Sequence, residues 1–411
     1  MDSLIEKRYL TPFLESLALQ RGKMAFLSGP RQAGKTTLGK NMLKTLGRGH
    51  YYTWDDIEFR RVWTKNPKRT ILNQDSPVSL YIYDEIHKAA RWKGTLKGIY
   101  DTLENPKQSQ ILVTGSARLN TYRKGGDSLL GRYLHFRLHP FSVGELLRNE
   151  ALNPDMVLEN LLSSQPASAE ALDAFNRLFQ FGGFPEPLLE ANEELGVIWR
   201  RGRLEKIIRE DLRDLSRLPE LSQVEMLVSL LEEKVGGLLS VESLREDLEV
   251  AHSTTQRWLN YLQQLYYCYI IRPYHRSLPR ALKKEPKLYL WDWSEVQNPA
   301  ARFENLVAGH LLKACHFWTD IGKGNFDLFY LRDKEKNEID FLITKNRSPW
   351  LAVEVKSKDT HWSPAFKAFR TRITIPVCLQ VVQQNIEPES RSDSMGTCLT
   401  LGAASFLSQL P

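Results

Sequence analysis

The chain has 411 residues, of which 42% are hydrophobic and 26% are charged, a composition typical of a folded globular protein that excludes general disorder. This length allows about two to four domains, each with its own core, so several activities can coexist. The formal net charge of +7 favours an anionic partner such as nucleic acid, although a diffuse excess of this size also serves solubility.

The cysteines and the amino terminus bear on the compartment. The four cysteines contain no CxxC pair, which argues against a zinc ribbon or a disulfide framework and fits a reducing compartment: Cys268, Cys315, Cys378 and Cys398. The first residues, MDSLIEKRYL, include acids and no apolar signal core, and no run approaches the roughly 18 apolar residues of a membrane span. We therefore expect a cytoplasmic protein without a membrane partner.

The first motif lies between a short apolar strand at residues 24–27 and a helix that carries Leu38, Met42 and Leu43. It matches GxxxxGK[ST] in the strand-loop-helix setting of a phosphate-binding loop. Its backbone N–H groups and the following helix predict a site for ATP, with Lys35 reaching the β and γ phosphates and Thr36 ligating Mg²⁺. The predicted nucleotide-binding residues are Gly29, Pro30, Arg31, Gln32, Ala33, Gly34, Lys35, Thr36 and Thr37.

Two further strands predict the rest of an ATPase core. The apolar run at residues 80–83 ends in Asp84 and Glu85, which predicts an Mg²⁺ ligand and a general base for the attacking water. The run at 110–114 leads to Ser116, a candidate contact for the γ phosphate. Three strands that alternate with helices predict a parallel sheet with the nucleotide at its carboxyl edge.

Six motifs in chain order carry a family resemblance: GPRQAGKTT, YIYDEIHKA, TGSARL, SLLGR, LHPFSVGEL and FGGFPE. Together they resemble a prokaryotic P-loop ATPase family related to the AAA+ proteins. Members of that family carry a C-terminal domain of unknown function that resembles the restriction-endonuclease fold. The resemblance implies an arginine that acts on a neighbouring subunit's nucleotide, and Arg132, at the end of SLLGR, is the candidate. A structural arginine that caps the sheet is the alternative. A role in trans implies a homo-oligomer.

Residues 151–223 are mostly helical in pattern, with FGGFPEP at 181–187 as a break. We interpret them as a lid over the nucleotide. The stretch from Arg200, RRGRLEKIIREDLRDLSRL, is dense in both signs of charge, as on the solvated face of a helix. An intersubunit or DNA contact is the less favoured interpretation.

Residues 224–285 follow the order of a winged helix. Leu244 and Leu248 mark one helix, Trp258 to Leu265 mark a second, and Tyr269 to Ile271 mark a strand. The exposed start of the second helix contains Ser253, Thr254, Gln256 and Arg257, and the basic residues in and beyond the wing are His275, Arg276, Arg280, Lys283, Lys284 and Lys287. Arg257, Arg276, Arg280, Lys283 and Lys284 are the candidate DNA-binding residues. A packing or dimer module is the alternative.

The carboxyl-terminal stretch NEIDFLITKNRSPWLAVEVKS, residues 337–357, predicts a hairpin in which Asp340 faces Glu354 at roughly 5 Å. With a helical Glu304 and the Glu354-x-Lys356 pair, the order matches the PD-(D/E)XK pattern of nucleases, in which carboxylates hold a metal and a lysine orients water. Glu304, Asp340, Glu354 and Lys356 are thus the candidate nuclease site. A solvated hairpin, or a site that keeps the shape without cleavage, is the alternative.

The sequence as a whole predicts an α/β protein: a P-loop NTPase core with a parallel sheet at 1–150, a helical lid at 151–223, a winged helix-turn-helix at 224–285 and a restriction-endonuclease-like α/β domain at 286–411. The expected function is ATP binding and Mg²⁺-dependent hydrolysis by an AAA+-type motor or switch that acts on DNA. One alternative is a nucleotide-gated protein scaffold with an inactive nuclease-like domain. Another is a metal-dependent endonuclease regulated by ATP.

Overall fold

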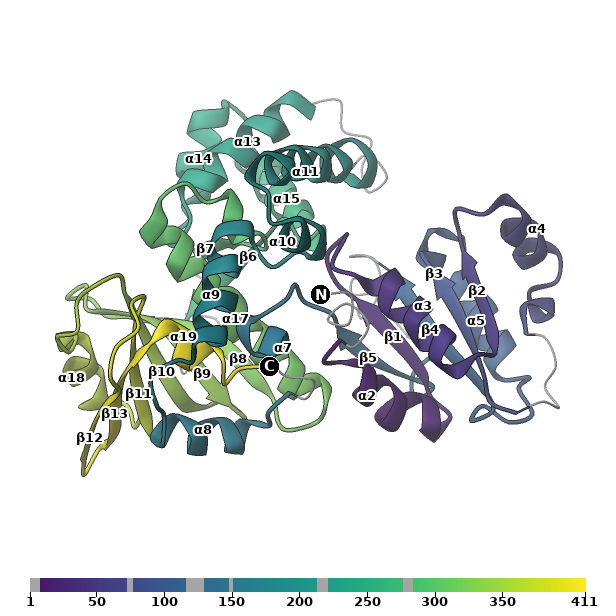
Figure 1. Cartoon of the computed structure of the whole chain (residues 1–411). Coiled ribbons are helices and arrows are strands. Elements are labelled where there is room, and N and C mark those ends of the chain that lie inside the picture. Colours follow the sequence, from purple (N-terminus) through teal and green to yellow (C-terminus); the bar gives the residue numbers. More distant parts are fainter. Residues whose placement is uncertain (1–7, 72–76, 116–128, 148–150, 213–220, 276–283) are drawn as a thin grey trace. The chain divides into compact units, whose positions relative to one another are not determined.

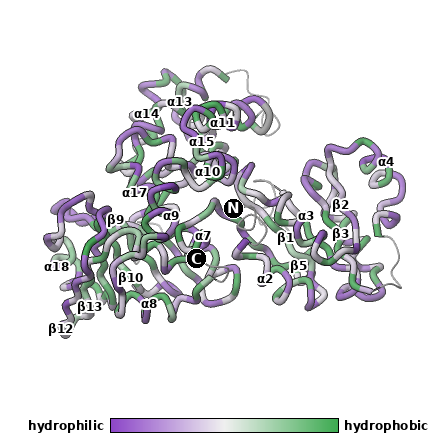
Figure 2. Tube along the Cα trace, viewed as in Figure 1, coloured by the Kyte–Doolittle hydropathy of each residue, from purple (hydrophilic) through white to green (hydrophobic). Residues whose placement is uncertain are grey.

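The computed structural model describes residues 8–71, 77–115, 129–147, 151–212, 221–275 and 284–411. The chain divides into two compact units, Met1–Pro140 and Phe141–Pro411, and each is described by itself (Figure 1). Hydrophobic residues are frequent along the central strands of both units, whereas the helices carry many hydrophilic residues (Figure 2). None of the helices within the described ranges has the length and apolar character needed to cross a bilayer.

The first unit is built on a parallel five-stranded sheet with the order β2-β3-β4-β1-β5. Its strands are β1 (Met24–Ser28), β2 (Gly49–Thr53), β3 (Ser79–Asp84), β4 (Ser109–Gly115) and β5 (Tyr133–Arg137). The strands β1 and β3 are buried along their whole length, as expected where helices cover both faces of a parallel sheet. The predicted parallel sheet is confirmed, and β2 and β5 extend it beyond the three expected strands.

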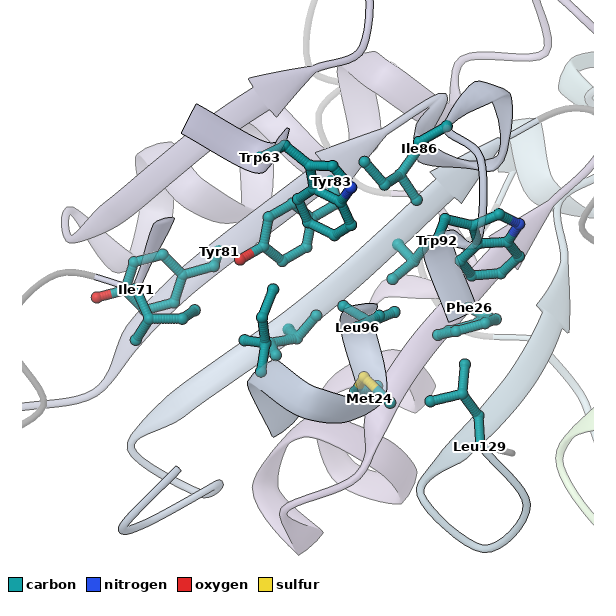
Figure 3. Close-up of a cluster of buried hydrophobic side chains, with 14 of the residues drawn as sticks. Met24, Phe26, Trp63, Ile71, Tyr81, Tyr83, Ile86, Trp92, Leu96 and Leu129 are labelled. Carbon is teal, nitrogen blue, oxygen red and sulfur yellow. The ribbon is translucent and has the colours of Figure 1, made fainter. Parts of the chain in front are cut away.

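Helices cover both faces of this sheet. Helix α3 (Lys35–Leu46) lies so close to one face that a Cβ added at Gly39 would meet Ile82 at 3.3 Å. Helices α4 (Ile57–Lys65) and α5 (Trp92–Tyr100) cover the other face through an apolar cluster that includes Phe26, Trp63 and Tyr83 (Figure 3). A helical segment that starts with α2 (Thr11–Phe13) and runs to Arg21 precedes β1. The helices on the two faces together hold the carboxyl ends of the strands in place around the phosphate loop.

The second unit begins with helices, as the pattern of residues 151–223 predicted. They are α7 (Val143–Leu147), α8 (Pro154–Leu162), α9 (Ala169–Phe181), α10 (Pro185–Glu190), α11 (Glu193–Lys206), α13 (Leu221–Glu233), α14 (Val241–Leu248) and α15 (His252–Gln264). The expected break falls between α9 and α10, where Gly182 has a positive φ of 81°. Such a φ favours glycine, which ends α9 at this position.

A mixed eight-stranded sheet with the order β12-β13-β11-β10-β9-β8-β6-β7 forms the rest of the second unit. Its strands are β6 (Cys268–Pro273), β7 (Lys287–Leu290), β8 (Phe326–Arg332), β9 (Glu338–Lys345), β10 (Ser348–Lys356), β11 (Val377–Val382), β12 (Glu389–Asp393) and β13 (Gly396–Gly402). The helices α17 (Pro299–Asp320), α18 (Pro364–Arg370) and α19 (Ala403–Leu407) belong to the same unit. Strand β6 pairs with β7 on one side and with β8 on the other, so residues 268–290 are part of this sheet.

This continuity bears on the expected domain boundaries. The expected boundary between residues 285 and 286 separates β6 from its antiparallel partner β7. The boundary between the two compact units falls in the chain between Pro140 and Phe141, near the expected end of the ATPase core at 150. The division of the second unit into lid, winged helix and nuclease-like domain remains a prediction.

Candidate functional site

The phosphate loop connects β1 to α3 through backbone conformations that favour glycine. Gly29 has φ of 155°, and a Cβ there would lie 2.2 Å from the carbonyl oxygen of Leu138, so a side chain does not fit. Gly34, the residue before the helix, has φ of 93°. The Lys35 ammonium donates to the carbonyl oxygens of Gly29 at 2.9 Å and Pro30 at 2.7 Å. The lysine is therefore held inside the curve of the loop.

The carboxylate of Asp84 lies at the end of β3 and accepts three hydroxyl hydrogen bonds. Thr36 Oγ1 donates to Oδ2 at 2.8 Å, Tyr51 Oη donates to the same oxygen at 2.6 Å, and Thr114 Oγ1 donates to Oδ1 at 2.5 Å. The neighbours β2, β3 and β4 are parallel, so their carboxyl ends meet at one edge and supply Tyr51, Asp84 and Thr114. Burial, and then the hydrogen bond to Asp84, raise the pKa of Tyr51. This threefold contact fixes the carboxylate beside the loop.

Tyr51 was not among the predicted site residues. The run GHYYT lacks the apolar character of the strands that the sequence singled out. One signal in the sequence could have identified it. The run lies between the phosphate loop and the strand that ends in Asp84, and a strand there that pairs in parallel with β3 ends at the same edge of the sheet. Lys40 lies over its ring, with Nζ 4.5 Å from the centroid, so the ring is also held from the side of α3.

The residues at this edge fit an Mg²⁺ ion. Mg²⁺ prefers oxygen ligands, and the Thr36 hydroxyl and the Asp84 carboxylate provide such oxygens next to the phosphate loop. Their separation of 2.8 Å places both groups within reach of one ion. Thr36 and Asp84 are therefore the residues that would hold the metal of a bound MgATP.

Glu85 follows directly and takes the left-handed backbone conformation, with φ of 55°. Its N–H donates to the carbonyl of Thr114 at 2.9 Å, which directs the side chain toward the same edge of the sheet. The side chain is 19% exposed, with His87 Nε2 at 3.5 Å and Lys88 Nζ at 3.8 Å from Oε2. Burial raises the pKa of Glu85, and the positive charges of Lys35 and Lys88 partly oppose this. A raised pKa brings the carboxylate closer to the range of an effective general base.

Of the two remaining catalytic candidates, the structure describes only Arg132, and it does not join this cluster. Arg132 precedes β5, and its carbonyl accepts from the N–H of Met24, the first residue of β1. It therefore lies at the amino edge of the sheet, opposite the phosphate loop. Its guanidinium forms two hydrogen bonds with Asp101, at 2.6 and 3.1 Å. Ser116 lies outside the described residues.

The predicted hairpin has the expected register. Strands β9 and β10 pair antiparallel with Phe341 opposite Val353, and the turn residues Asn346 and Arg347 both have positive φ. This register places Asp340 beside Glu354. Val355 N–H donates to Asp340 Oδ2 at 2.9 Å, and Asp340 N–H contacts Glu354 Oε2 at 3.4 Å. The two carboxylates that the sequence paired are thus brought together.

A lysine lies at the centre of the neighbouring carboxylates. Lys287 Nζ is 2.7 Å from Glu338 Oε1, 3.1 Å from Asp340 Oδ1 and 3.3 Å from Glu304 Oε1, and its side chain is only 4% exposed. We refer to these four residues as the Lys287 cluster. Tyr289 Oη adds a hydrogen bond to Glu304 at 2.7 Å. The sequence counted Lys287 among the basic residues in and beyond the wing, but its ammonium is buried against three acids and is not an exposed positive charge.

The residues of the candidate nuclease site do not fit a divalent ion in this arrangement. The Lys287 ammonium already lies against Glu304 and Asp340, and the Lys356 ammonium lies 2.8 Å from Glu354 Oε1. Within the described ranges, no group of three or more histidine, cysteine or acidic side chains is placed to hold a metal ion. Burial, followed by the charge of Asp340, raises the pKa values of Glu304 and Glu354 to about 7. The cation that these acids meet is a lysine side chain.

The candidate DNA-binding residues are only partly described. Arg257 lies on α15 and is exposed, as are Ser253 and Gln256 on the same helix, and Lys284 is exposed before β7. Arg276, Arg280 and Lys283 lie outside the described residues. The polar start of α15 therefore faces solvent, whereas Trp258 and Leu262 on its other side are buried.

Family models match three successive segments of the chain. Residues 21–147 match a family described as "AAA domain". Most of the first unit is therefore similar to AAA domains. Residues 172–296 match a domain of unknown function (DUF8612), and residues 300–397 match another domain of unknown function (DUF4143). The second match includes the strands β6 and β7, in agreement with their pairing in the structure.

The curated relatives are uncharacterized proteins. One from Mycobacterium tuberculosis is 22% identical over 364 residues, which cover 87% of this chain and 75% of that protein. One from Haemophilus influenzae is 22% identical over 343 residues, which cover 78% of this chain and 79% of that protein. One from Methanocaldococcus jannaschii is 23% identical over 302 residues, or 71% and 64% of the two chains. The similarity thus extends beyond the AAA-type domain.

Solved structures give weak overall similarity. A Walker-type ATPase of Pyrococcus abyssi matches with a TM-score of 0.36 and 16% identity, covering 68% of this chain and 90% of that one. ORC1 of Aeropyrum pernix in complex with DNA matches with 0.33 and 13%, covering 72% and 91%. A RuvB variant of Thermotoga maritima matches with 0.32 and 17%, covering 63% and 86%. These TM-scores are too low to support a conclusion about this chain.

Proposed function

We propose that the first unit binds MgATP and hydrolyses it. The observation that carries this proposal is the Thr36–Asp84 hydrogen bond of 2.8 Å, with Lys35 inside the loop and Glu85 next along the chain. A structural glycine turn requires neither an acid against the first turn of the helix nor a second acid beside it. Together these residues supply a phosphate cradle, a metal position and a base at one edge of the sheet.

Each residue has a separate task in this proposal. Backbone N–H groups of the loop and the start of α3 bind the phosphates, and Lys35 neutralises the β and γ phosphates. Asp84 orients the Thr36 hydroxyl. Glu85 accepts a proton from the water that attacks the γ phosphate. The metal, when bound, supplies positive charge that stabilises the phosphate oxygens.

Two substitutions with different expected defects test the proposal. Lys35→Ala removes the phosphate contact, so ATP binding should be lost, whereas Glu85→Gln should retain binding and slow turnover at least roughly a hundredfold, the usual scale for a general base. Equilibrium binding of a fluorescent ATP analogue and steady-state phosphate release measure the two effects. The exposed residues Lys44 and Glu58 provide matched controls, as Lys44→Ala and Glu58→Gln. Turnover at the parental rate in Glu85→Gln would remove Glu85 from the mechanism.

We further propose that hydrolysis drives a switch or motor that acts on DNA, with α14 and α15 as the helix-turn-helix and β6 and β7 as the strands of a wing. Two observations support this: the exposed polar start of α15 with Arg257, and the antiparallel pairing of β6 with β7 after it. A homo-oligomer, with Arg132 acting on a neighbour's nucleotide, belongs to the same proposal. In that case Arg132 exchanges its pairing with Asp101 for a phosphate contact.

The second candidate function is a nucleotide-gated protein scaffold with a nuclease-like but non-cleaving carboxyl-terminal domain. The Lys287 cluster favours the absence of cleavage, because an ammonium occupies the space between Glu304 and Asp340 that a catalytic ion needs. An ATP-regulated metal-dependent endonuclease, the remaining alternative, is disfavoured for the same reason. DNA-stimulated ATP hydrolysis separates the leading proposal from the scaffold.

A further inference from the structure

Two of the four cysteines lie side by side in the large sheet. Cys378 on β11 and Cys398 on β13 are register partners in a parallel pair of strands. Register partners on neighbouring strands project from the same face, and strands lie about 4.8 Å apart. That spacing falls within the Cα separation of about 4.4 to 6.8 Å that a disulfide bridges.

The two thiols differ in their burial and in their charged neighbours, so we expect them to differ in reactivity. Cys378 is fully buried and packs in an apolar cluster that includes Phe366 and Phe369. Cys398 is partly exposed, and Arg370 Nη1 donates to its sulfur at 3.2 Å. The hydrogen bond from Cys378, and then the charge of Arg370, lower the pKa of Cys398 to about 7. A thiolate at Cys398 is therefore accessible near neutral pH.

Arg370 is held in place for this contact. Its side chain is 7% exposed, its Nη2 donates to the carbonyl of Gly396 at 3.1 Å, and it also pairs with Asp393. It lies at the end of α18, while Asp393 and Gly396 flank the β12–β13 turn. The guanidinium is thus fixed between the helix and the turn, with one N–H directed at the sulfur.

We propose that Cys398 and Cys378 form a peroxide-reactive thiol pair, in which Cys398 is the nucleophile and Cys378 resolves the oxidised product. The Cys398 sulfur attacks one oxygen of a hydroperoxide, the O–O bond breaks, and the other oxygen leaves and takes a proton, as water when the oxidant is hydrogen peroxide. Sulfur is oxidised by two electrons to the sulfenic acid and the peroxide is reduced. The Cys378 sulfur then attacks the Cys398 sulfur, the S–O bond breaks, and hydroxide leaves with the Cys378 proton as water.

The consequence of this chemistry is a covalent link between β11 and β13, next to β12 at the end of the sheet. The proposal does not rest on ATP hydrolysis. The other two cysteines serve as internal references, since Cys268 and Cys315 are fully buried. Burial raises the pKa of Cys268 to about 12, so it remains a thiol under the same conditions.

The test treats the full-length protein with hydrogen peroxide at pH 7 and follows each cysteine by peptide mass spectrometry. In the parent, we expect two of the four thiols to disappear together as an intramolecular Cys378–Cys398 disulfide. In Cys378→Ser, the sulfenic acid should persist and be trapped by dimedone on Cys398. Arg370→Met should slow the reaction roughly tenfold, because the thiolate fraction falls. Cys398→Ser should leave Cys378 reduced.

Circular dichroism and thermal unfolding show whether each variant is folded, and Cys268 and Cys315 should remain unmodified throughout. Three outcomes would overturn the proposal. The first is reaction of Cys398 in the parent at no more than the rate of free cysteine at the same pH. The second is loss of Cys378 in Cys398→Ser. The third is a disulfide that joins two chains on a non-reducing gel in place of the intramolecular link.

Discussion

The hydroxyl groups of Tyr51 and Thr36 donate to the same oxygen of Asp84. Removing the Tyr51 hydroxyl therefore tests how much this hydrogen bond from β2 helps Asp84 to bind the metal. We predict that Tyr51→Phe leaves the protein folded and lowers turnover at limiting Mg²⁺ roughly fivefold, the effect of about 1 kcal/mol for one lost hydrogen bond. The Mg²⁺ dependence of ATP hydrolysis measures this effect. A purely structural role would change stability and leave the Mg²⁺ dependence unaltered.

The matched control for this prediction is Tyr52→Phe. Tyr52 is the next residue on β2, but its hydroxyl donates to the carbonyl of Thr70 at 2.8 Å and does not contact the site. It should therefore retain the parental Mg²⁺ dependence. Equal shifts in both variants would assign the effect to the strand and not to the Asp84 contact.

The raised pKa of Glu85 makes a prediction about pH. A general base acts only when it is deprotonated, and burial raises the pKa of the Glu85 carboxyl above its ordinary value of 4.5. Hydrolysis should therefore be full above the raised pKa and fall as the pH drops through it, on an acid limb that lies above pH 4.5. The turnover number at saturating MgATP, measured across pH, gives the midpoint. The residual activity of Glu85→Gln should lack this limb, and an unchanged limb would show that another group titrates.

At the scale of secondary structure, the Lys287 cluster joins β7, α17 and β9 through one ammonium. We predict that Lys287→Met destabilises the protein by about 3 to 5 kcal/mol, because Glu304, Glu338 and Asp340 are left close together without their cation. Chemical denaturation measures the change. Protonation of the acids relieves their repulsion, so the loss should be smaller at pH 5 than at pH 8.

Lys345 provides the control for this prediction. It forms a single exposed ion pair with Asp155, and Lys345→Met should cost no more than about 1 kcal/mol. A similar cost for both lysines would mean that the Lys287 cluster is not a buried charge network. Metal-dependent nicking of DNA by the parent protein, lost in Asp340→Asn, would contradict the non-cleaving assignment directly.

The sequence predicted those elements whose signals are local. The phosphate loop, the acidic end of β3 and the register of the β9–β10 hairpin each follow from residues within one short stretch. By contrast, the contact of Tyr51 with Asp84 depends on which strand neighbours β3, and β2 is a short run with no strong period. The contacts of Lys287 with Glu304 and Asp340 were not predicted either, because the four residues of β7 do not show which face meets α17. Contacts between strands that are distant in the chain therefore limit how much of the site can be predicted from the sequence.

At the scale of the whole molecule, all the described strands of the second unit belong to one sheet, including the two that follow its helices. Strand β6 follows α15 directly, and its partner β7 carries Lys287, so the proposed DNA-binding helix and the carboxylate cluster are linked through one hairpin. The resemblance to nuclease domains suggested a separate module that begins at residue 286. The pairing of β6 with β7 and β8 places residues 268–290 in the large sheet instead.

The last prediction follows from the proposed DNA-binding role of α15: duplex DNA stimulates ATP hydrolysis through Arg257 and Lys284. The double variant Arg257→Glu and Lys284→Glu should reduce stimulation and leave the DNA-free rate unchanged, since neither residue lies at the phosphate loop. The slope of log affinity against log salt should fall by about 1 for each lost phosphate contact. Reversal of two other exposed lysines of the second unit, Lys323 and Lys358, makes the same total change in charge and should retain stimulation. Equal loss in both double variants would reveal non-specific attraction of DNA to a basic protein. ATP hydrolysis that DNA does not stimulate at any salt concentration would favour the nucleotide-gated scaffold.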